Sequence, residues 1–280
     1  MEKIAAASQL VKAEVFRNLH QRPGIFVVPN PWDAGSAKML AALGFEALAT
    51  TSAGLAFMLA KPDGVGVVTR EDALSNAKAI ASAVNIPVSG DLENGYGDEP
   101  EACSETVLLA AEAGLVGCSI EDNTGRPADP IYDFDLAVER VKAAVSAARS
   151  LPFPFVLTAR AENLIYGKMD LKDTLRRLEA FAAAGADVLF APGLITREEI
   201  EAAVKTVSPK PLNVVMGLRG ATYTVDELGA MGVKRISIGS SLARAAYDGF
   251  YRAAQEIKDK GSFRYAENII SYDFINEMFR

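Results

Sequence analysis

The amino-acid sequence predicts an α/β protein whose single domain, residues 1–280, is a (β/α)8 TIM barrel with an additional C-terminal helical segment at 262–280. Two observations lead to this prediction. Eight short β-rich runs alternate strictly with longer helical runs in one uninterrupted chain, and the chain length is usual for such a barrel. The predicted strands are also entered alternately through a glycine helix stop and a proline, a rhythm that suits a barrel interior filled by alternate strands.

A doubly wound open sheet is the alternative fold for the same alternation. No Gly-x-Gly-x-x-Gly follows the first predicted strand, although a dinucleotide-binding open sheet would be expected to carry one there. The hydrophobic content of 50% provides enough apolar surface for one large core. We therefore favour the closed barrel.

The first half of the chain contains four predicted strands, at 26–30, 47–50, 86–91 and 116–120. Asp33 is a suitable N-cap for the first helix, and Gly44 is a suitable stop. Residues 51–68 are predicted to form a long loop, after which Thr69 caps the next helix. The helix after the third strand carries an apolar stripe that would pack against a sheet, and it ends at Gly114.

The second half repeats the pattern, with predicted strands at 155–159, 188–191, 212–215 and 236–238. Thr196 and Thr224 each begin a Thr-x-x-Glu sequence, the capping box that marks a helix start. Apolar side chains then recur at helical spacing after the eighth unit, namely Tyr265, Ile269, Tyr272, Ile275 and Phe279. A helix packed on its own barrel would explain them, but we favour a contact between subunits.

Charge and composition exclude several classes of protein. The net charge is -7 and the basic residues are scattered, without a run that could follow nucleic-acid phosphates. No apolar run approaches the roughly 20 residues that a membrane span requires, and the first residues lack a signal-peptide pattern. Cys103 and Cys118 show no metal-binding or disulfide spacing, so we expect both in the core of a cytoplasmic protein.

Barrel enzymes place their active sites at the carboxyl ends of the strands, so the polar residues that follow the predicted strands form the candidate site. These residues are Asn30, Asp33, Ser52, Asp63, Asp91, Glu93, Glu121, Asp122, Arg160, Glu162, Asn213 and Ser240. Acidic side chains dominate this set. Such a group of carboxylates would repel itself unless a positive charge lay among them.

Asp91 and Glu93 are the strongest candidates for binding a cation. In extended backbone, residues two apart point the same way, so both carboxylates could face one ion. Oxygen ligands without paired histidines or cysteines select Mg2+ or Mn2+ over zinc. The glycines Gly95 and Gly97 would let a ligand or a backbone segment come close. Asp33 and Asp122, by contrast, fit equally well as helix caps or solvated loop charges.

Arg160 stands directly at the end of the apolar fifth strand. A guanidinium opposite a metal would hold a small carboxylate or a developing enolate. Ser52, Ala53 and Gly54 could offer backbone N–H groups and one hydroxyl to a second carboxylate, although such a sequence is also typical of a simple turn. The single histidine, His20, precedes the first strand and is expected at the surface, so histidine-dependent acid–base chemistry is not expected.

Three stretches together resemble the isocitrate lyase and phosphoenolpyruvate mutase superfamily. They are 91–97 (DLENGYG), 119–123 (SIEDN) and 158–162 (TARAE), and the resemblance extends from residue 16 to about residue 251. It implies a (β/α)8 barrel, Mg2+, and a small 2-oxo or 2-hydroxy acid substrate that reacts through an enolate. It also implies a homo-oligomer, commonly a tetramer built from dimers that exchange C-terminal helices, which would use the segment 262–280.

The resemblance also assigns roles to individual residues. Asp91 would coordinate the metal directly, while Asp63, Glu93 and Glu121 would hold its waters. Ser52, Ala53 and Gly54 match the loop that binds the substrate carboxylate, and Arg160 matches the arginine on the enolate side. Asn213 and Ser240 match polar positions at the ends of the seventh and eighth strands. Arg160 and Glu121 are therefore the expected catalytic residues.

The sequence departs from the family after the Glu121-Asp122 pair. Lyases of the family carry a Lys-x-Cys-Gly-His loop there, whereas residues 123–130 (NTGRPADP) are shorter and contain neither Cys nor His. The family's Asp-x-Asp has also become Asp91-x-Glu93, which lengthens one ligand arm and keeps the charge. The enolate-stabilising residues are retained.

We therefore expect a Mg2+-dependent enzyme that cleaves or decarboxylates a small 2-oxo or 2-hydroxy carboxylic acid through an enolate, with Mn2+ as the alternative ion. The expected assembly is a homo-oligomer, dimer or tetramer. One alternative is an enzyme acting on the P–C bond of phosphonopyruvate or a related compound, as mutase or hydrolase. Another is a 2-oxo-acid-binding protein with little catalysis, which the missing acid–base loop would favour.

Overall fold

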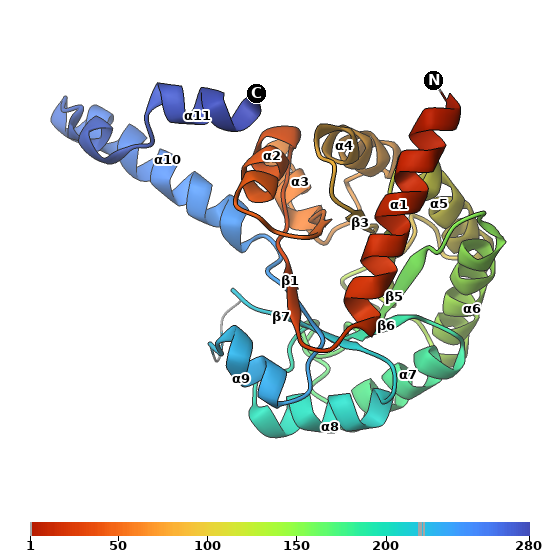
Figure 1. The fold of residues 1–280 in the computed structure, drawn as a ribbon. Coiled ribbons are helices and arrows are strands. Elements are labelled where there is room, and N and C mark those ends of the chain that lie inside the picture. Colours follow the sequence, from red (N-terminus) through yellow and green to blue (C-terminus); the bar gives the residue numbers. More distant parts are fainter. Residues whose placement is uncertain (1, 218–219, 221) are drawn as a thin grey trace.

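Eight parallel strands form the centre of the protein. The computed structural model describes residues 2–217, 220 and 222–280 (Figure 1). Its strands are β1 (Phe26–Val28), β2 (Leu48–Ala49), β3 (Val88–Asp91), β4 (Gly117–Glu121), β5 (Val156–Arg160), β6 (Val188–Phe190), β7 (Leu212–Val215) and β8 (Arg235–Ser237). They form one sheet in the order β1-β8-β7-β6-β5-β4-β3-β2. Because β8 returns to lie beside β1, the sheet is a nearly closed barrel, and the predicted (β/α)8 fold is confirmed.

The seam between β1 and β2 is held by single hydrogen bonds rather than by a ladder. The Ala49 N–H donates to the Pro29 carbonyl at 3.1 Å. The buried Asn30 side chain donates to the Thr50 carbonyl at 2.8 Å. Its Oδ1 accepts from the N–H groups of two residues that follow β8, at 2.9 and 3.0 Å. Asn30 therefore joins three segments at the top of the barrel.

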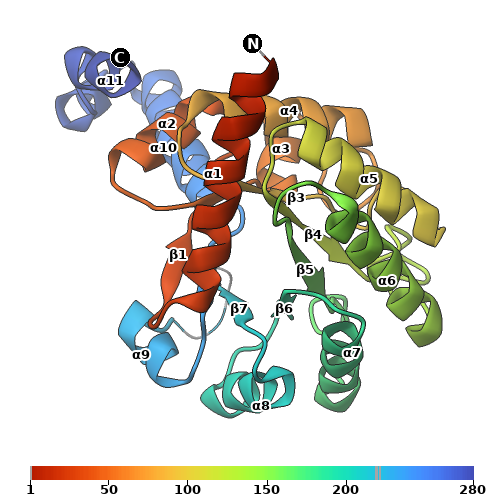
Figure 2. The same ribbon diagram turned by 45° about the vertical axis from the view of Figure 1, so that its right-hand side comes forward.

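Helices surround the outer face of the barrel (Figure 2). They are α2 (Ala34–Ala42), α3 (Ser52–Met58), α4 (Arg70–Ala83), α5 (Pro100–Glu112), α6 (Phe134–Ser150), α7 (Leu171–Ala183), α8 (Arg197–Val207) and α9 (Val225–Ala230). The predicted caps at Asp33, Thr69, Thr196 and Thr224 are confirmed, since each side chain accepts a hydrogen bond from the backbone N–H three residues further on. These local signals fix where the helices begin.

Helix α3 lies where the sequence predicted only loop. The Thr51 hydroxyl oxygen accepts from the Gly54 N–H at 3.2 Å and caps this short helix. Leu55 and Ala56 are buried against the neighbouring elements. The prediction of an unstructured 51–68 is therefore wrong for its first half, because burial stabilises a helix that the Ser-Ala-Gly sequence alone does not favour.

An N-terminal helix, α1 (Glu2–Gln21), closes the amino-terminal end of the barrel. Its buried Phe16 belongs to an apolar cluster with Phe26, Val156 and Val188, which begin β1, β5 and β6. A Cβ atom added at Gly117, the first residue of β4, would lie 3.1 Å from the Phe16 ring. The phenyl group thus fills the space that a side chain on β4 would otherwise occupy.

His20, predicted to lie at the surface, is packed into this end of the barrel. Its ring lies between the rings of Phe16 and Phe26, with centroids 4.7 and 5.0 Å away. Nδ1 lies 2.8 Å from the Phe16 carbonyl, and Nε2 lies 3.4 Å from Nη1 of Arg235. Burial and the Arg235 charge lower the pKa of His20 to about 3, so the imidazole is neutral. The surface assignment was therefore wrong.

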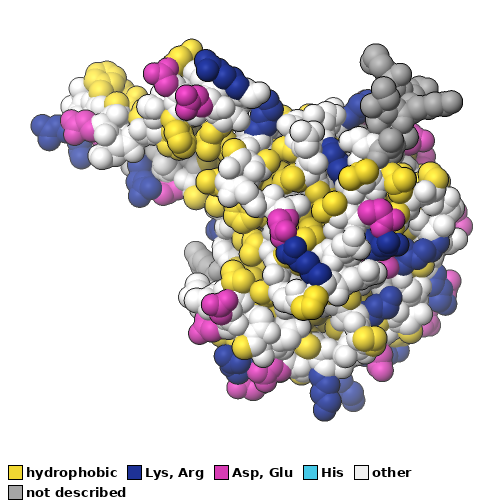
Figure 3. All heavy atoms as spheres, in the orientation of Figure 1, with side chains coloured by type: hydrophobic (Ala, Val, Ile, Leu, Met, Phe, Trp, Pro, Cys, Tyr) yellow, Lys and Arg dark blue, Asp and Glu magenta, His cyan; other side chains and the backbone are white. Residues whose placement is uncertain are grey.

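The C-terminal region leaves the barrel as a projecting arm. Helix α10 (Ser241–Lys260) extends outward, and after a short 3-10 turn at Arg264–Asn268, helix α11 (Tyr272–Phe279) returns to α2 (Figure 1). The predicted helical stripe over 262–280 is interrupted, because Ile269 has extended backbone. Ala243 is the one buried residue of α10, and Phe250 and Tyr272 are 72% and 82% exposed. Figure 3 shows hydrophobic side chains at the surface of this projecting arm.

Two predictions based on composition can be compared with this fold. Cys103 and Cys118 are both free and buried, as expected for core residues. Among the described residues, no helix is both long enough and apolar enough to span a bilayer.

Candidate active site

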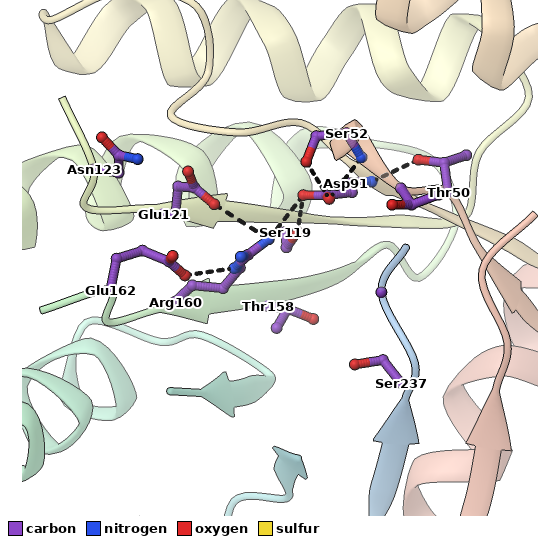
Figure 4. A network of polar contacts seen from close by, with 12 residues as sticks. Thr50, Ser52, Asp91, Ser119, Glu121, Asn123, Thr158, Arg160, Glu162 and Ser237 are labelled. Atoms are coloured by element: carbon purple, nitrogen blue, oxygen red, sulfur yellow. Dashed lines mark hydrogen bonds and ion pairs between the residues drawn. The ribbon is translucent and has the colours of Figure 1, made fainter. Parts of the chain in front are cut away.

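Arg160, the last residue of β5, is surrounded by three carboxylates at the carboxyl ends of the strands (Figure 4). Its Nη1 lies 2.8 Å from Asp91 Oδ1 and 3.2 Å from Glu121 Oε2, and its Nε donates to Glu162 Oε1 at 2.8 Å. Burial acts to lower the pKa of Arg160, but the three carboxylates outweigh it and hold the pKa well above its ordinary value. The guanidinium is therefore permanently charged and fixed in orientation.

The strand register explains why these groups meet. Glu121 and Arg160 are opposite each other in the parallel β4–β5 pair, and Asp91 is opposite Ser119 in the β3–β4 pair. Glu121 and Arg160 therefore lie at one level, and Asp91 lies two residues lower in the register, where the Arg160 side chain reaches it. Glu162 follows two residues after Arg160, and its backbone N–H donates to Asp122 Oδ1 at 2.8 Å.

Asp91 is held from several sides. Its Oδ2 accepts from both the backbone N–H and the hydroxyl of Ser52, each at 2.9 Å, while its own backbone N–H donates to the Thr50 hydroxyl oxygen at 2.8 Å. Ser119 lies 3.4 Å from Oδ1. Ser52, the first residue of α3, therefore donates its backbone N–H to Asp91. The two positions lie 39 residues apart in the sequence, which gave no sign of this contact.

The acidic residues around Asp91 resist ionisation. Burial, followed by the charges of Asp91 and Asp63, raises the pKa of Glu93 to about 7. Burial raises the pKa of Glu121 well above its ordinary value, with Arg160 opposing the shift. Burial and the Asp91 carboxylate also raise the pKa of Asp63. Full ionisation of these groups would give the site more negative charge than Arg160 neutralises, so protons or a bound cation would stabilise it.

Glu93 joins this cluster from a turn that follows β3, not from the extended strand that the sequence predicted. Strand β3 ends at Asp91, and Glu93 has a left-handed φ of 46°, so the two residues do not share extended backbone. A Cβ at Gly95 or Gly97 would meet α5, since it would lie 3.1 Å from Cys103 Sγ or 2.6 Å from Ala102 Cβ. Of the two expectations for these glycines, the close approach of a backbone segment is confirmed at Gly95, where a Cβ would lie 3.2 Å from Cys103 Cα.

The donor chemistry of the cluster fits a divalent cation. Asp63, Asp91, Glu93 and Glu121 offer only oxygen ligands, which Mg2+ prefers, and their repulsion is unbalanced. Across residues 2–217, 220 and 222–280, however, no three acidic, histidine or cysteine side chains are arranged to hold an ion. Asp91 and Glu121 instead pair with Arg160.

Most of the predicted site residues surround a cavity of about 190 Å³ that extends into the barrel. Those that line it are Asn30, Ser52, Ala53, Asp63, Asp91, Arg160, Asn213 and Ser240. Glu93 and Glu121 line a neighbouring cavity of about 660 Å³, which lies between the loops that follow β2, β3 and β4. Gly54 lines neither of these two cavities, because it is buried and its N–H bonds to Thr51.

Asn213 lies deep in the first cavity, with both ends of its amide engaged. Its Nδ2 donates to Ser237 Oγ at 2.9 Å, and its Oδ1 accepts from Arg235 Nε at 2.8 Å. Sequence reasoning missed Arg235 and Ser237. The signal was present, because residues two apart on β8 point to the same side, and polar residues at such positions inside a barrel are unusual.

Two further groups brace the site. The buried Asp122 pairs with Arg177 of α7 at 2.9 Å and fixes the backbone of Glu162, so it is a structural residue, neither a cap nor a solvated charge. The loop 123–130 is tied to the β3 loop, since Arg126 pairs with Asp98 at 2.8 Å. Asn123 also hydrogen-bonds the Tyr166 hydroxyl across the mouth.

An arginine among buried carboxylates, at the carboxyl ends of parallel barrel strands and above a small cavity, is the arrangement of an active site in a barrel enzyme. Comparison with known proteins identifies the family of the chain. A family model described as phosphoenolpyruvate phosphomutase matches residues 16–258, so the chain belongs to the phosphoenolpyruvate phosphomutase family.

Individual relatives agree with this assignment. A crystal structure from Burkholderia cenocepacia J2315, to which a lyase or mutase activity is attributed, superimposes with a TM-score of 0.94 at 53% identity, covering 98% of this chain and 97% of that chain. Oxaloacetate acetylhydrolase in complex with oxalate gives 0.86 at 28% identity, over 97% and 94%. The 2-methylisocitrate lyase of Salmonella typhimurium is 31% identical over 76% of this chain and 75% of its own length. The protein is an enzyme of this superfamily of lyases and mutases.

Proposed function

We propose that the protein is a Mg2+-dependent carbon–carbon lyase or decarboxylase that acts on a small 2-oxo or 2-hydroxy carboxylic acid through an enolate, with Mn2+ as the alternative ion. The observation that carries this proposal is the contact of Arg160 with Asp91, Glu121 and Glu162 at the strand ends. The activities of the relatives support it, because 2-methylisocitrate lyase and oxaloacetate acetylhydrolase both carry substrates of this class in their names. We place it in the cytoplasm.

Arg160 is the proposed electrophilic residue. Its Nε and Nη1 contact carboxylates, whereas Nη2 has no hydrogen-bond partner among the described residues. That N–H group is available to a substrate oxygen, where it would stabilise the negative charge of a forming enolate. Glu121 and Glu162 hold the guanidinium in place, so little reorganisation is needed when charge develops.

The acidic cluster is the proposed metal site. Asp91 would bind the ion, and Asp63, Glu93 and Glu121 would hold its waters. The ion would polarise the substrate carbonyl. Because Arg160 occupies Asp91 Oδ1, binding would require this pair to separate or share the carboxylate. Ser52 and Ala53 are the proposed contacts for the substrate carboxylate, and Ser240 is proposed at the rim of the same cavity. Gly54 would shape this loop from its buried position, where its N–H bonds to Thr51. We propose that Asn213 contributes to substrate binding there.

A substrate panel tests the proposal. Purified protein with Mg2+ should release pyruvate from oxaloacetate or a related 2-oxo or 2-hydroxy acid, and chelation should abolish turnover. Turnover of phosphonopyruvate alone would instead identify a P–C bond enzyme, the alternative that the name of the matching family model favours. Calorimetric binding of 2-oxo acids without any turnover would identify a binding protein, which the Cys-free and His-free loop 123–130 favours.

We also propose that the projecting arm, 241–280, packs on a second copy of the chain in a dimer or tetramer. Apolar and aromatic residues of this arm are exposed within one chain, including Phe250, Tyr251, Phe263 and Tyr272. Their exposed area would be covered by an exchange of C-terminal helices between subunits. Light scattering coupled to size exclusion should give a mass of two or four chains, and a monomer would contradict the proposal.

A further inference from the structure

The hydroxyl of Tyr166 lies where the two cavities of the site meet. Asp63 lines the smaller cavity, and the adjacent Gly64 lines the larger one. A Cβ atom added at Gly64 would lie 3.4 Å from the Tyr166 hydroxyl oxygen. Ile165, which precedes Tyr166, lines the smaller cavity, and Asn123, which hydrogen-bonds the hydroxyl, lines the larger one. The phenol therefore lies beside the space that both cavities share.

The direction of the hydrogen bond between Tyr166 and Asn123 is fixed. Asn123 Oδ1 accepts from the Gly125 N–H at 2.6 Å, so the amide nitrogen, Nδ2, is the atom that faces Tyr166. An amide nitrogen can only donate, so the Tyr166 oxygen accepts. Tyr166 keeps its own O–H proton, and no acceptor among residues 2–217, 220 and 222–280 takes it. This proton is available to a ligand.

A buried turn after β5 holds Tyr166 in place as a neutral phenol. The Tyr166 backbone N–H donates to the Glu162 carbonyl at 3.3 Å. The fully buried Asn163 side chain donates to two carbonyls further along the turn, both at 3.1 Å, and accepts from Thr174 of α7 at 2.9 Å. Burial, followed by the charges of Glu121 and Glu162, raises the pKa of Tyr166, so the phenol is protonated at neutral pH.

Other side chains that commonly donate protons are engaged or lie elsewhere. His20 lies at the amino-terminal end of the barrel, and Cys103 and Cys118 are buried in an apolar cluster. Tyr132 already donates to a carboxylate at 2.6 Å. Tyr96 lines the larger cavity, but its hydroxyl oxygen is buried and has no hydrogen-bond partner among the described residues. The phenol that follows β5 is therefore the best-placed donor.

We propose that Tyr166 is the general acid that protonates the enolate carbon of the substrate. This inference rests on the proposed function, because that reaction supplies the enolate. When the carbon–carbon bond breaks, its electron pair forms the enolate. The enolate carbon then takes the O–H proton of Tyr166, and water returns a proton to the partly exposed phenolate. In Figure 4, Ser52 and Asn123 lie on opposite sides of Arg160, so a substrate held at Ser52 would extend past Arg160 toward Tyr166.

Exchange of the methyl hydrogens of pyruvate in D2O tests this proton transfer without bond cleavage. Wild-type protein with Mg2+ should catalyse the exchange, measured as loss of the methyl signal in proton NMR, because protonation at carbon is reversible. Tyr166→Phe should lower the exchange rate by about 10²- to 10⁴-fold, the usual contribution of a general acid or base. The variant should still bind oxalate, a stable planar analogue of the pyruvate enolate, with wild-type affinity in calorimetry. Equal exchange rates in both proteins, or no exchange in the wild type, would overturn the proposal.

Two further variants separate this role from a structural one. Asn123→Asp keeps the shape of the side chain but turns Nδ2 into an acceptor for the phenol proton, so exchange should fall although the phenol is present. Tyr96→Phe removes the other hydroxyl and should exchange at the wild-type rate, whereas loss of exchange in this variant alone would contradict the assignment. The proposed function fails separately: if no 2-oxo or 2-hydroxy acid is cleaved while exchange still depends on Tyr166, the proton donor stands and the cleavage reaction does not.

Discussion

The environment of His20 makes a specific prediction about stability at low pH. The imidazole lies between two aromatic rings and next to the Arg235 guanidinium, so protonation would place two cations together in the barrel. His20→Gln keeps a hydrogen-bond acceptor near Arg235 and removes the titration. Comparing the two proteins isolates this one group from the carboxylates that titrate in the same range.

The sign follows from the lowered pKa. The unfolded chain protonates His20 near 6.5, whereas the folded protein does so only near pH 3, so unfolding is favoured progressively as the pH falls through that window. Above about pH 6.5 the group has no effect. A pH of 4 is about 2.5 units below the pKa of His20 in the unfolded chain. At about 1.36 kcal/mol per unit, protonation there stabilises the unfolded state by about 3 kcal/mol.

Urea unfolding at pH 7 and pH 4, at one fixed protein concentration, measures this difference. The wild type should lose about 3 kcal/mol more than His20→Gln between the two pH values. The two proteins should be similar at pH 7, because glutamine can replace the acceptor. Equal losses in both proteins would show that His20 is solvated, and the packing described for α1 would be wrong.

Three further predictions concern the scaffold and the assembly. Phe16→Ala should lower the free energy of unfolding by about 3–5 kcal/mol, because it leaves a cavity where α1 closes the barrel; a loss below 1 kcal/mol in urea would contradict that packing. Arg177→Met should cost about 3–5 kcal/mol by leaving Asp122 buried and unpaired, and a combined Asp122→Asn exchange should restore part of it. Phe250→Glu with Tyr251→Glu should lower the mass in light scattering, whereas Lys205→Glu on α8 should not.

Much of the fold could be predicted because its signals are local. The caps at Thr69, Thr196 and Thr224 are short sequence patterns that fix helix starts, and apolar runs between them mark buried strands. Helix α3 was not predicted, because its stability comes from the burial of Leu55 and Ala56 rather than from the helix propensity of its residues. Helix α1 was not predicted, although Ala13 and Phe16 have helical spacing, because its packing partners at the starts of β1, β5 and β6 are far apart in the sequence.

The site was predicted in part for similar reasons. Strand ends could be found, so Asp91, Glu121 and Arg160 could be placed at one rim, and their contact across 69 residues of sequence follows from barrel geometry. The polar pair Arg235 and Ser237 carried a signal that was missed, whereas the hydrogen bond from Ser52 to Asp91 and the absence of an ion-pair partner for Arg235 among the described residues could not be foreseen. Both depend on which way a side chain turns and on what is missing around it, and these are properties of the packed interior.

The central claim is that Arg160 stabilises an enolate formed from a small 2-oxo or 2-hydroxy acid. The most direct test is kcat for a confirmed substrate with Mg2+, compared between wild type and Arg160→Gln, after circular dichroism has shown that both are folded. Loss of one preorganised donor should lower kcat by about 10²- to 10³-fold. Full activity in the folded Arg160→Gln enzyme would contradict the mechanism.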